Sequence, residues 1–140
     1  MIKMNKLPGT PARRFFALMS ALSLSSVALV GQVKTPTHAH ISYGPEDRQW
    51  VNLYLPSGSE PAPVFLYAHH NGTTADDLKS DWADPTVAEG IAIVSWESIA
   101  QIKGMSDYLT CAADAKMMFA WVKENAATYN LDIDKIFIGG

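Results

Sequence analysis

A chain of 140 residues has room for a single domain with a modest hydrophobic core. Its net charge is −3, and it becomes −7 once the basic first 14 residues are set aside, which argues against nucleic acid or anionic lipid as a partner. Cys111 is the only cysteine, so the chain can form neither an intrachain disulfide nor a cysteine-based metal site.

The first 31 residues have the pattern of a secretory signal peptide. Residues 1–14 carry basic and no acidic side chains, and residues 15–30 form an apolar run diluted by serines. This run is shorter than the ~20 residues that a membrane-spanning helix needs, so we expect export to the periplasm or the cell exterior rather than a membrane anchor. The pair Arg13–Arg14 also resembles a twin-arginine signal, although any basic segment can contain two arginines by chance.

Two strands are expected after a polar, proline-containing linker at residues 32–40. The domain is expected to begin near Ile41, with a short strand over residues 41–44. Residues 49–55 alternate, with Val51, Leu53 and Leu55 on one face. This period of two predicts a half-buried strand that runs antiparallel to the one before it and ends in the turn at residues 56–59.

Two continuous apolar runs follow, at residues 64–68 and 91–94. Runs without alternation are typical of strands that helices cover on both faces. Between the two runs, Asp84 and Pro85 form a good helix start and Gly90 a good helix end. We therefore expect a short helix over residues 85–89.

The clearest helix is expected from about Asp107 to Tyr129. Asn130 suits a left-handed helix end, residues 132–134 a turn, and residues 135–140 a strand that ends in two glycines. The order β-β-β-α-β-α-β predicts an α/β fold with a doubly wound sheet, in which a leading antiparallel hairpin precedes parallel strands joined by crossover helices. Apolar residues of the long helix form one stripe facing that sheet: Cys111, Ala115, Met118, Phe119, Val122, Ala126 and Tyr129, with Met117 and Trp121 outside it.

Four stretches carry a resemblance when they are taken in order: residues 41–44 with 53–56, residues 68–72, the helix around residues 114–126, and the strand at residues 134–140. Together they resemble the N-terminal portion of a carboxylesterase-type α/β hydrolase, over about residues 41–140. The resemblance implies a partial hydrolase sheet and a serine esterase that needs no cofactor. In this family the nucleophile follows a strand in a G-x-S-x-G elbow, so Gly139 and Gly140 would begin that elbow.

Residues 69–72 stand where the family has its His-Gly-Gly-Gly oxyanion loop. The resemblance implies that Asn71 and Gly72 supply the backbone N–H donors and that His69 anchors the loop. The chain departs from the family pattern because His70 and Asn71 stand where the family has glycine. The residues by themselves are also compatible with an ordinary polar turn. A metal site is not expected, because adjacent histidines on an extended segment point to opposite faces.

Trp96 and Glu97 follow the fourth predicted strand, where ligands often bind in open α/β sheets, and could line a substrate cleft. Packing of Trp96 in the core and a solvated loop position for Glu97 are equally compatible with the sequence. Cys111 lies on the apolar stripe of the long helix, which favours a buried structural thiol over a nucleophile. No serine of the chain stands in a G-x-S-x-G motif.

The first hypothesis is therefore the N-terminal fragment of an exported carboxylic-ester hydrolase acting on a small-molecule ester. The chain as given would be inactive, because nucleophile, acid and histidine would lie beyond residue 140, and the run at residues 136–138 would be an exposed apolar edge. The alternative is an exported, non-catalytic module that binds a small molecule or carbohydrate around Trp82, Trp96 and Tyr108.

Overall fold

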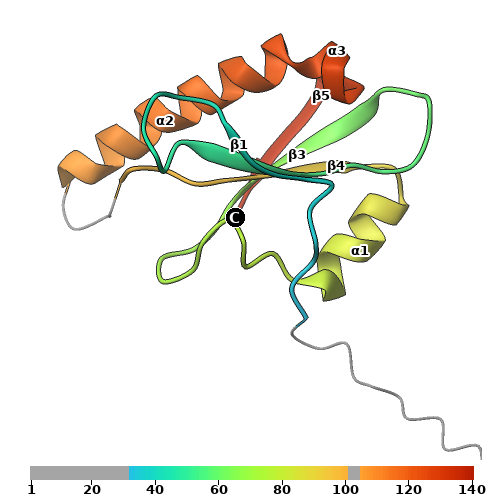
Figure 1. Ribbon diagram of the computed structural model, residues 1–140, viewed down its shortest axis with the longest axis horizontal. Helices are drawn as coiled ribbons and strands as arrows, with labels where there is room; N and C mark the ends of the chain where they lie inside the picture. The colour runs from blue at the N-terminus through green and yellow to red at the C-terminus, as the bar shows by residue number, and fades with distance from the viewer. Residues whose placement is uncertain (1–31, 101–104) are drawn as a thin grey trace, which may run out of the picture.

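The computed structural model describes residues 32–100 and 105–140, so the expected signal peptide at residues 1–31 lies outside the described residues. Within these two ranges no helix is both long and apolar enough to cross a membrane. The elements, drawn in Figure 1, are β1 (His38–Ser42), β2 (Trp50–Tyr54), β3 (Ala62–Ala68), α1 (Ser80–Ala88), β4 (Ala92–Trp96), α2 (Met105–Glu124), α3 (Ala126–Tyr129) and β5 (Leu131–Gly139).

The strands form one mixed sheet in the order β1-β2-β4-β3-β5. β1 pairs with β2 and β2 pairs with β4 in antiparallel fashion. β3 lies parallel to both β4 and β5, its neighbours on either side. The predicted α/β class, with an antiparallel hairpin before parallel strands, is therefore confirmed as a mixed sheet with helices.

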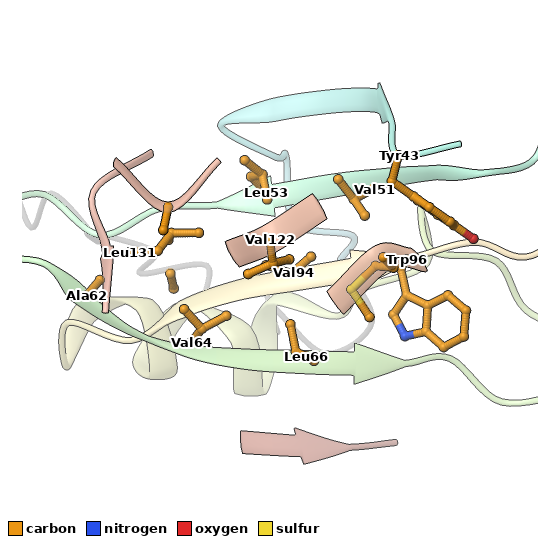
Figure 2. Packing of buried hydrophobic residues seen from close by; sticks show 13 residues of the cluster. Tyr43, Val51, Leu53, Ala62, Val64, Leu66, Val94, Trp96, Val122 and Leu131 are labelled. Carbon is orange, nitrogen blue, oxygen red and sulfur yellow. The ribbon is translucent and has the colours of Figure 1, made fainter. Parts of the chain in front are cut away.

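Helices cover both faces of this sheet, α2 and α3 on one side and α1 on the other (Figure 1). Under α2 and α3, Met118, Val122 and Ala126 pack on inward side chains of all the central strands. Figure 2 shows Val122 over Val94 in the middle of this cluster, with Tyr43 and Trp96 at one end. A smaller cluster joins the opposite face to α1 and contains Tyr54, Leu78, Ala83 and Ile93.

β2 lies where the alternation predicts it, but it is buried on both faces rather than on one. Val51 and Leu53 enter the larger cluster, whereas Tyr54 enters the smaller one. Asn52, on the same face as Tyr54, is also fully buried because its amide is held by the loop that follows β3. The polar residue in the alternating pattern thus marks a buried hydrogen-bonding position and not a solvated face.

The expected start of the first helix at Asp84–Pro85 is wrong. α1 begins at Ser80 with Lys79 as N-cap, and Pro85 lies inside the helix. Asp84 pairs instead with the ammonium group of Lys34, far away in the sequence. The end of the helix is as predicted, because Gly90 has φ of 86° and its N–H donates to the carbonyl of Val87.

The long helix is confirmed but is interrupted at Asn125, where α2 gives way to α3. Asn130 ends α3 in the left-handed conformation, as expected. The buried stripe is correct except at Phe119, which is exposed. Trp121, expected outside the stripe, packs against the core and lies beside the ring of Tyr129.

The two outer strands are longer than expected. β1 begins at His38, and Val33 already forms a bridge with Lys79, so part of the expected linker belongs to the sheet and its surroundings. β5 begins at Leu131, and the expected turn at residues 132–134 is a bulge within it. β5 lies at the edge of the sheet among the described strands, where Ile138 is 75% exposed, as the hypothesis of an apolar edge requires.

Candidate functional site

The carboxyl ends of β3, β4 and β5 lie side by side because these three strands are parallel. Ala68 is paired with Trp96, and Tyr67 with Gly139, so the segments that follow the three strands leave the same edge of the sheet. Figure 1 shows the C-terminus at this edge, beside the loop after β3. Gly140 approaches the end of β3 so closely that a Cβ atom on it would lie 1.8 Å from the carbonyl oxygen of Ala68.

A cleft of about 590 Å³ opens at this edge of the sheet. It brings together His69, Asn71 and Gly72 from the loop after β3 with Trp96 and Glu97 from the end of β4. Arg48, Ser98, Tyr108 and Cys111 complete its polar and aromatic lining together with Ala68, Thr73 and Ala100. The residues proposed from the sequence as oxyanion loop and as cleft lining therefore share one site.

The loop after β3 is a tight turn over residues 70–73. The N–H of Thr73 donates to the carbonyl oxygen of His70 at 3.2 Å, and the hydroxyl of Thr73 donates to the same oxygen at 2.8 Å. Gly72 has φ of 89°, and neither His70 nor Asn71 has positive φ. This combination defines a type II turn, whose third residue has to be left-handed and is therefore best supplied by glycine.

The departure from the triglycine pattern is compatible with this backbone, because only Gly72 needs the left-handed region. The N–H groups of Asn71 and Gly72 have no acceptor within residues 32–100 and 105–140. They are two adjacent unpaired donors on a turn that lines the cleft. Such donors are what an oxyanion site requires, provided that the reacting oxygen comes within hydrogen-bond distance.

Glu97 is the electrostatic centre of the site and is buried, not solvated. Its Oε1 atom accepts from Arg48 Nη2 at 2.6 Å and from the N–H of Ser98 at 3.3 Å, and it faces His69 Nε2 at 3.2 Å. Burial alone would raise the pKa of this carboxyl, but the hydrogen bonds from His69 and Arg48 outweigh burial and bring the pKa to about 2. Glu97 is therefore an ionised structural carboxylate.

His69 lies between two acceptors, an arrangement that favours its protonated form. Its Nε2 atom faces the Glu97 carboxylate, and its Nδ1 atom lies 3.2 Å from the carbonyl oxygen of His70. Both hydrogen bonds can form only when both ring nitrogens carry a proton. The hydrogen bond with Glu97 accordingly raises the pKa of His69 against the opposing effect of burial. This arrangement agrees with a loop anchor and leaves the imidazole without a free acceptor nitrogen.

A buried carboxylate on α2, Asp114, was not singled out from the sequence. It accepts from Gln49 Nε2 at 2.7 Å, from the Ser98 hydroxyl at 2.5 Å and from the N–H of Ile99 at 3.0 Å. Asp114 thus fastens the segment after β4 to α2. The signal was present in the sequence, because position 114 lies three residues after Cys111 and four before Met118, on the buried stripe, where a charge needs a partner.

The two tryptophans that the sequence proposed for a binding cleft, Trp82 and Trp96, lie in different places. Trp96 is both 7% exposed and part of the cleft lining, so the packing and cleft interpretations are compatible. Trp82 lies on the opposite face of the sheet, beside Phe65 and Tyr67, and does not share the cleft with Trp96 and Tyr108.

Cys111 lines the cleft, but it lacks the surroundings of an activated nucleophile. Burial, with the nearby Asp114 carboxylate, raises the pKa of its thiol, whereas a reactive cysteine needs a lowered pKa. No group of three or more His, Cys, Asp or Glu side chains that could hold a metal ion occurs in the described part of the chain.

Comparison with known proteins relates this fold to esterases. No family model matches the chain, and no curated protein sequence matches it either. A truncated form of a carbohydrate esterase from gut microbiota superposes with a TM-score of 0.61 and 17% identity, over 78% of this chain and 40% of that one. A bifunctional GH43-CE protein from Bacteroides eggerthii gives a TM-score of 0.57 and 22% identity, over 71% of this chain and 13% of that one.

A protein described as a candidate thioesterase, from a Silicibacter species, is similar in the same way. Its TM-score is 0.51 at 20% identity, over 71% of this chain and 35% of that one. The fold is therefore of a kind found in esterase-type hydrolases. The chain spans less than half the length of each of these three structures.

Proposed function

We propose that this domain is the N-terminal portion of an exported serine esterase of the α/β hydrolase type, acting on a small-molecule ester. The observation that carries the proposal is the pair of unpaired N–H groups on Asn71 and Gly72, placed at the edge where β5 ends. The fold shared with structures described as esterases supports it. Export rests on the basic and apolar pattern of residues 1–31.

The proposed chemistry is acyl transfer to water through an acyl-enzyme. Attack on the ester carbonyl places negative charge on its oxygen, and the two N–H groups of the turn stabilise this charge. His69 and Glu97 hold the turn in place through their ion pair. Because β5 ends beside the turn, a serine one or two residues after Gly140 would enter the same cleft.

The oxyanion role can be tested by removing one N–H group without changing the turn. Asn71 is the second residue of a type II turn, where proline is favoured, so Asn71→Pro deletes the donor and keeps the backbone. In a longer protein that contains this domain and the downstream serine, we expect kcat for p-nitrophenyl acetate to fall about 10²–10³-fold, with little change in KM.

Asn71→Ala is the matched control because it removes the side chain and keeps the N–H group. We expect its kcat to stay close to that of the unmodified enzyme. Equal activity of the proline and alanine variants, at equal thermal stability, would contradict the oxyanion assignment and favour an ordinary polar turn.

The proposed position of the nucleophile has its own test. The chain of residues 1–140 should show no ester turnover that a fluorophosphonate blocks. Fluorophosphonate-sensitive turnover by this chain would overturn the assignment of the serine to a position after Gly140. Sequencing of the DNA downstream of codon 140 should show a reading frame with a serine in a G-x-S-x-G elbow.

A binding module without catalysis is the second candidate, and one observation favours it. The cleft of about 590 Å³ is formed within the chain and presents Trp96 and the half-exposed Tyr108 beside charged groups. A binding module should unfold in one cooperative, reversible thermal transition as a monomer. A truncated enzyme should instead aggregate through β5.

A further inference from the structure

Most N–H donors of the Arg48 guanidinium, which lines the cleft, have no partner among the described residues. Arg48 lies in the segment between β1 and β2, and its side chain is 49% exposed. Of its five N–H groups, one donates to Glu97, and the structure shows no other protein partner for the guanidinium within residues 32–100 and 105–140. The guanidinium therefore offers four further donors to a ligand in the cleft.

Arg48 is one of several partners of the Glu97 carboxylate. His69 Nε2 faces this carboxylate at 3.2 Å, and the N–H groups of Ser98 and Ala75 also donate to it. The carboxylate is only 4% exposed, whereas Arg48 reaches solvent. Arg48 therefore keeps one N–H group on a buried carboxylate while the rest of its half-exposed guanidinium lines the cleft.

The charged residues that line the cleft are Arg48, His69 and Glu97, and Arg48 is the one that stays cationic throughout the neutral pH range and is half exposed. The chain as a whole is at −3, so this cation is not a result of general basicity. Of the nearby carboxylates, Asp114 is buried among its own donors, and Asp77 accepts from the N–H and the hydroxyl of Thr74. Glu46 and Asp47 precede Arg48 in the chain but line a separate hollow. The cleft thus presents a cation that a bound anion can reach.

We propose that the cleft binds an ester substrate that also carries a carboxylate, with Arg48 as the residue that selects it. This inference rests on the proposed esterase function and names its substrate class. A guanidinium presents a planar fork of N–H groups that matches the two oxygens of a carboxylate. The exposed ring of Tyr108, at the same cleft, provides an aromatic side for the body of the ligand.

The test is a binding measurement on the chain of residues 1–140, which needs no turnover. Two carboxylates, glucuronate and benzoate, are titrated against their uncharged counterparts, glucose and benzamide, and chemical-shift changes of the backbone amides are followed. We expect at least one carboxylate to bind about tenfold or more tightly than its counterpart and to shift Arg48, His69 and Gly72. Glucuronate as the tighter ligand would assign the carboxylate to a sugar, and benzoate to an aromatic acid.

Arg48→Gln should weaken carboxylate binding about tenfold or more. Lys123→Gln, on α2 and away from the cleft lining, makes the same change in net charge and should have no effect. Equal weakening by both variants would reduce the effect to net charge and overturn the proposal. Equal binding of carboxylates and uncharged counterparts to the unmodified chain would overturn it too, and that comparison holds even if a variant fails to fold.

The two proposals can fail separately. In one outcome, carboxylate binding depends on Arg48 but the Asn71→Pro enzyme keeps its kcat. That result would support the role of Arg48 in substrate selection and contradict the oxyanion assignment. An Asn71→Pro enzyme that loses kcat, together with a chain that binds no carboxylate, would leave the esterase function and remove the role of Arg48.

Discussion

Single buried polar side chains hold the cleft together. Glu97 links Arg48, His69 and the N–H groups of Ala75 and Ser98, and Asp114 links α2 to the segment after β4. Buried charges of this kind are tolerated only when most of their hydrogen bonds are formed. Each therefore constrains the position of the loops that surround it.

The ion pair of His69 and Glu97 predicts a pH window for stability. The pKa of Glu97 falls from 4.5 to about 2 on folding, so its contribution is present above pH 4.5 and is lost as the pH falls toward 2. The pKa of His69 rises above 6.5 on folding, so its contribution is complete below pH 6.5 and is lost at higher pH. Urea unfolding of the chain should show the largest contribution of the pair between pH 4.5 and 6.5.

His69→Gln is the control, because glutamine can donate to Glu97 but does not titrate. The variant should lose the decline in stability above pH 6.5 that the imidazolium causes. An alkaline decline of the same size in both proteins would show that His69 is not charged in the folded state.

For two buried tyrosines we predict opposite effects of a change to phenylalanine on the free energy of unfolding. The hydroxyl of Tyr43 donates to the carbonyl oxygen of Glu97 at 2.6 Å, whereas the buried hydroxyl of Tyr54 has no partner among the described residues. Tyr43→Phe should lower the free energy of unfolding by about 1–2 kcal/mol, because it leaves a buried carbonyl without its donor. Tyr54→Phe should leave it unchanged or raise it. Chemical denaturation of both variants checks the pair, and a larger loss for Tyr54→Phe would contradict the assignment.

The cleft forms where the segments that connect the helices and strands come together. The three parallel strands bring their carboxyl ends together, and the turn at residues 70–73 and the segment after β4 leave from there. α2 then fixes the second of these segments from outside the sheet. Loss of the hydrogen bonds between Asp114 and this segment should change the structure of the cleft more than that of the sheet.

Asp114→Ala tests the link between α2 and the cleft. The substitution leaves Gln49, Ser98 and the N–H of Ile99 without their acceptor, so we expect a loss of about 2–4 kcal/mol in the free energy of unfolding. Glu124→Ala, at an exposed position at the end of the same helix, should change it by less than about 0.5 kcal/mol. Similar losses in urea for the two variants would show that Asp114 matters only for helix stability.

At the scale of the whole molecule, β5 presents an exposed apolar edge, and further exposed apolar side chains lie on α2. This strand pairs only with β3, and Phe137 and Ile138 are 56% and 75% exposed. An unpaired apolar edge of this kind is a site of association between strands. It is also where a longer sheet could continue, as the partial coverage of the matched structures allows.

We therefore expect the chain to self-associate through β5 as its concentration rises. Ile138→Lys should reduce association, because a charge on an edge strand opposes pairing with another strand. Leu109→Lys is the matched control, since Leu109 is 77% exposed but lies on α2. Analytical ultracentrifugation compares the two, and equal reduction by both would place the association elsewhere.

Most of the elements could be predicted from local patterns, and the errors have identifiable causes. The strands at β3 and β4 were found because their apolar runs are continuous, and the end of α1 because Gly90 marks a left-handed position. The start of α1 was missed because Asp84 pairs with Lys34, fifty positions away, which no local pattern reveals. The bulge in β5 depends on pairing with Pro63 and Val64, which is equally non-local.

The sequence by itself determined the α/β class, the loop at residues 69–72 and the glycine pair at the end of β5, since periodicity and turn chemistry are properties of neighbouring residues. Only the tertiary structure decided that His69 meets Glu97, that Arg48 stands at the same cleft and that Trp82 does not. Strand order and register set these contacts. They arise from burial on both faces of the sheet, which is a property of the folded chain as a whole.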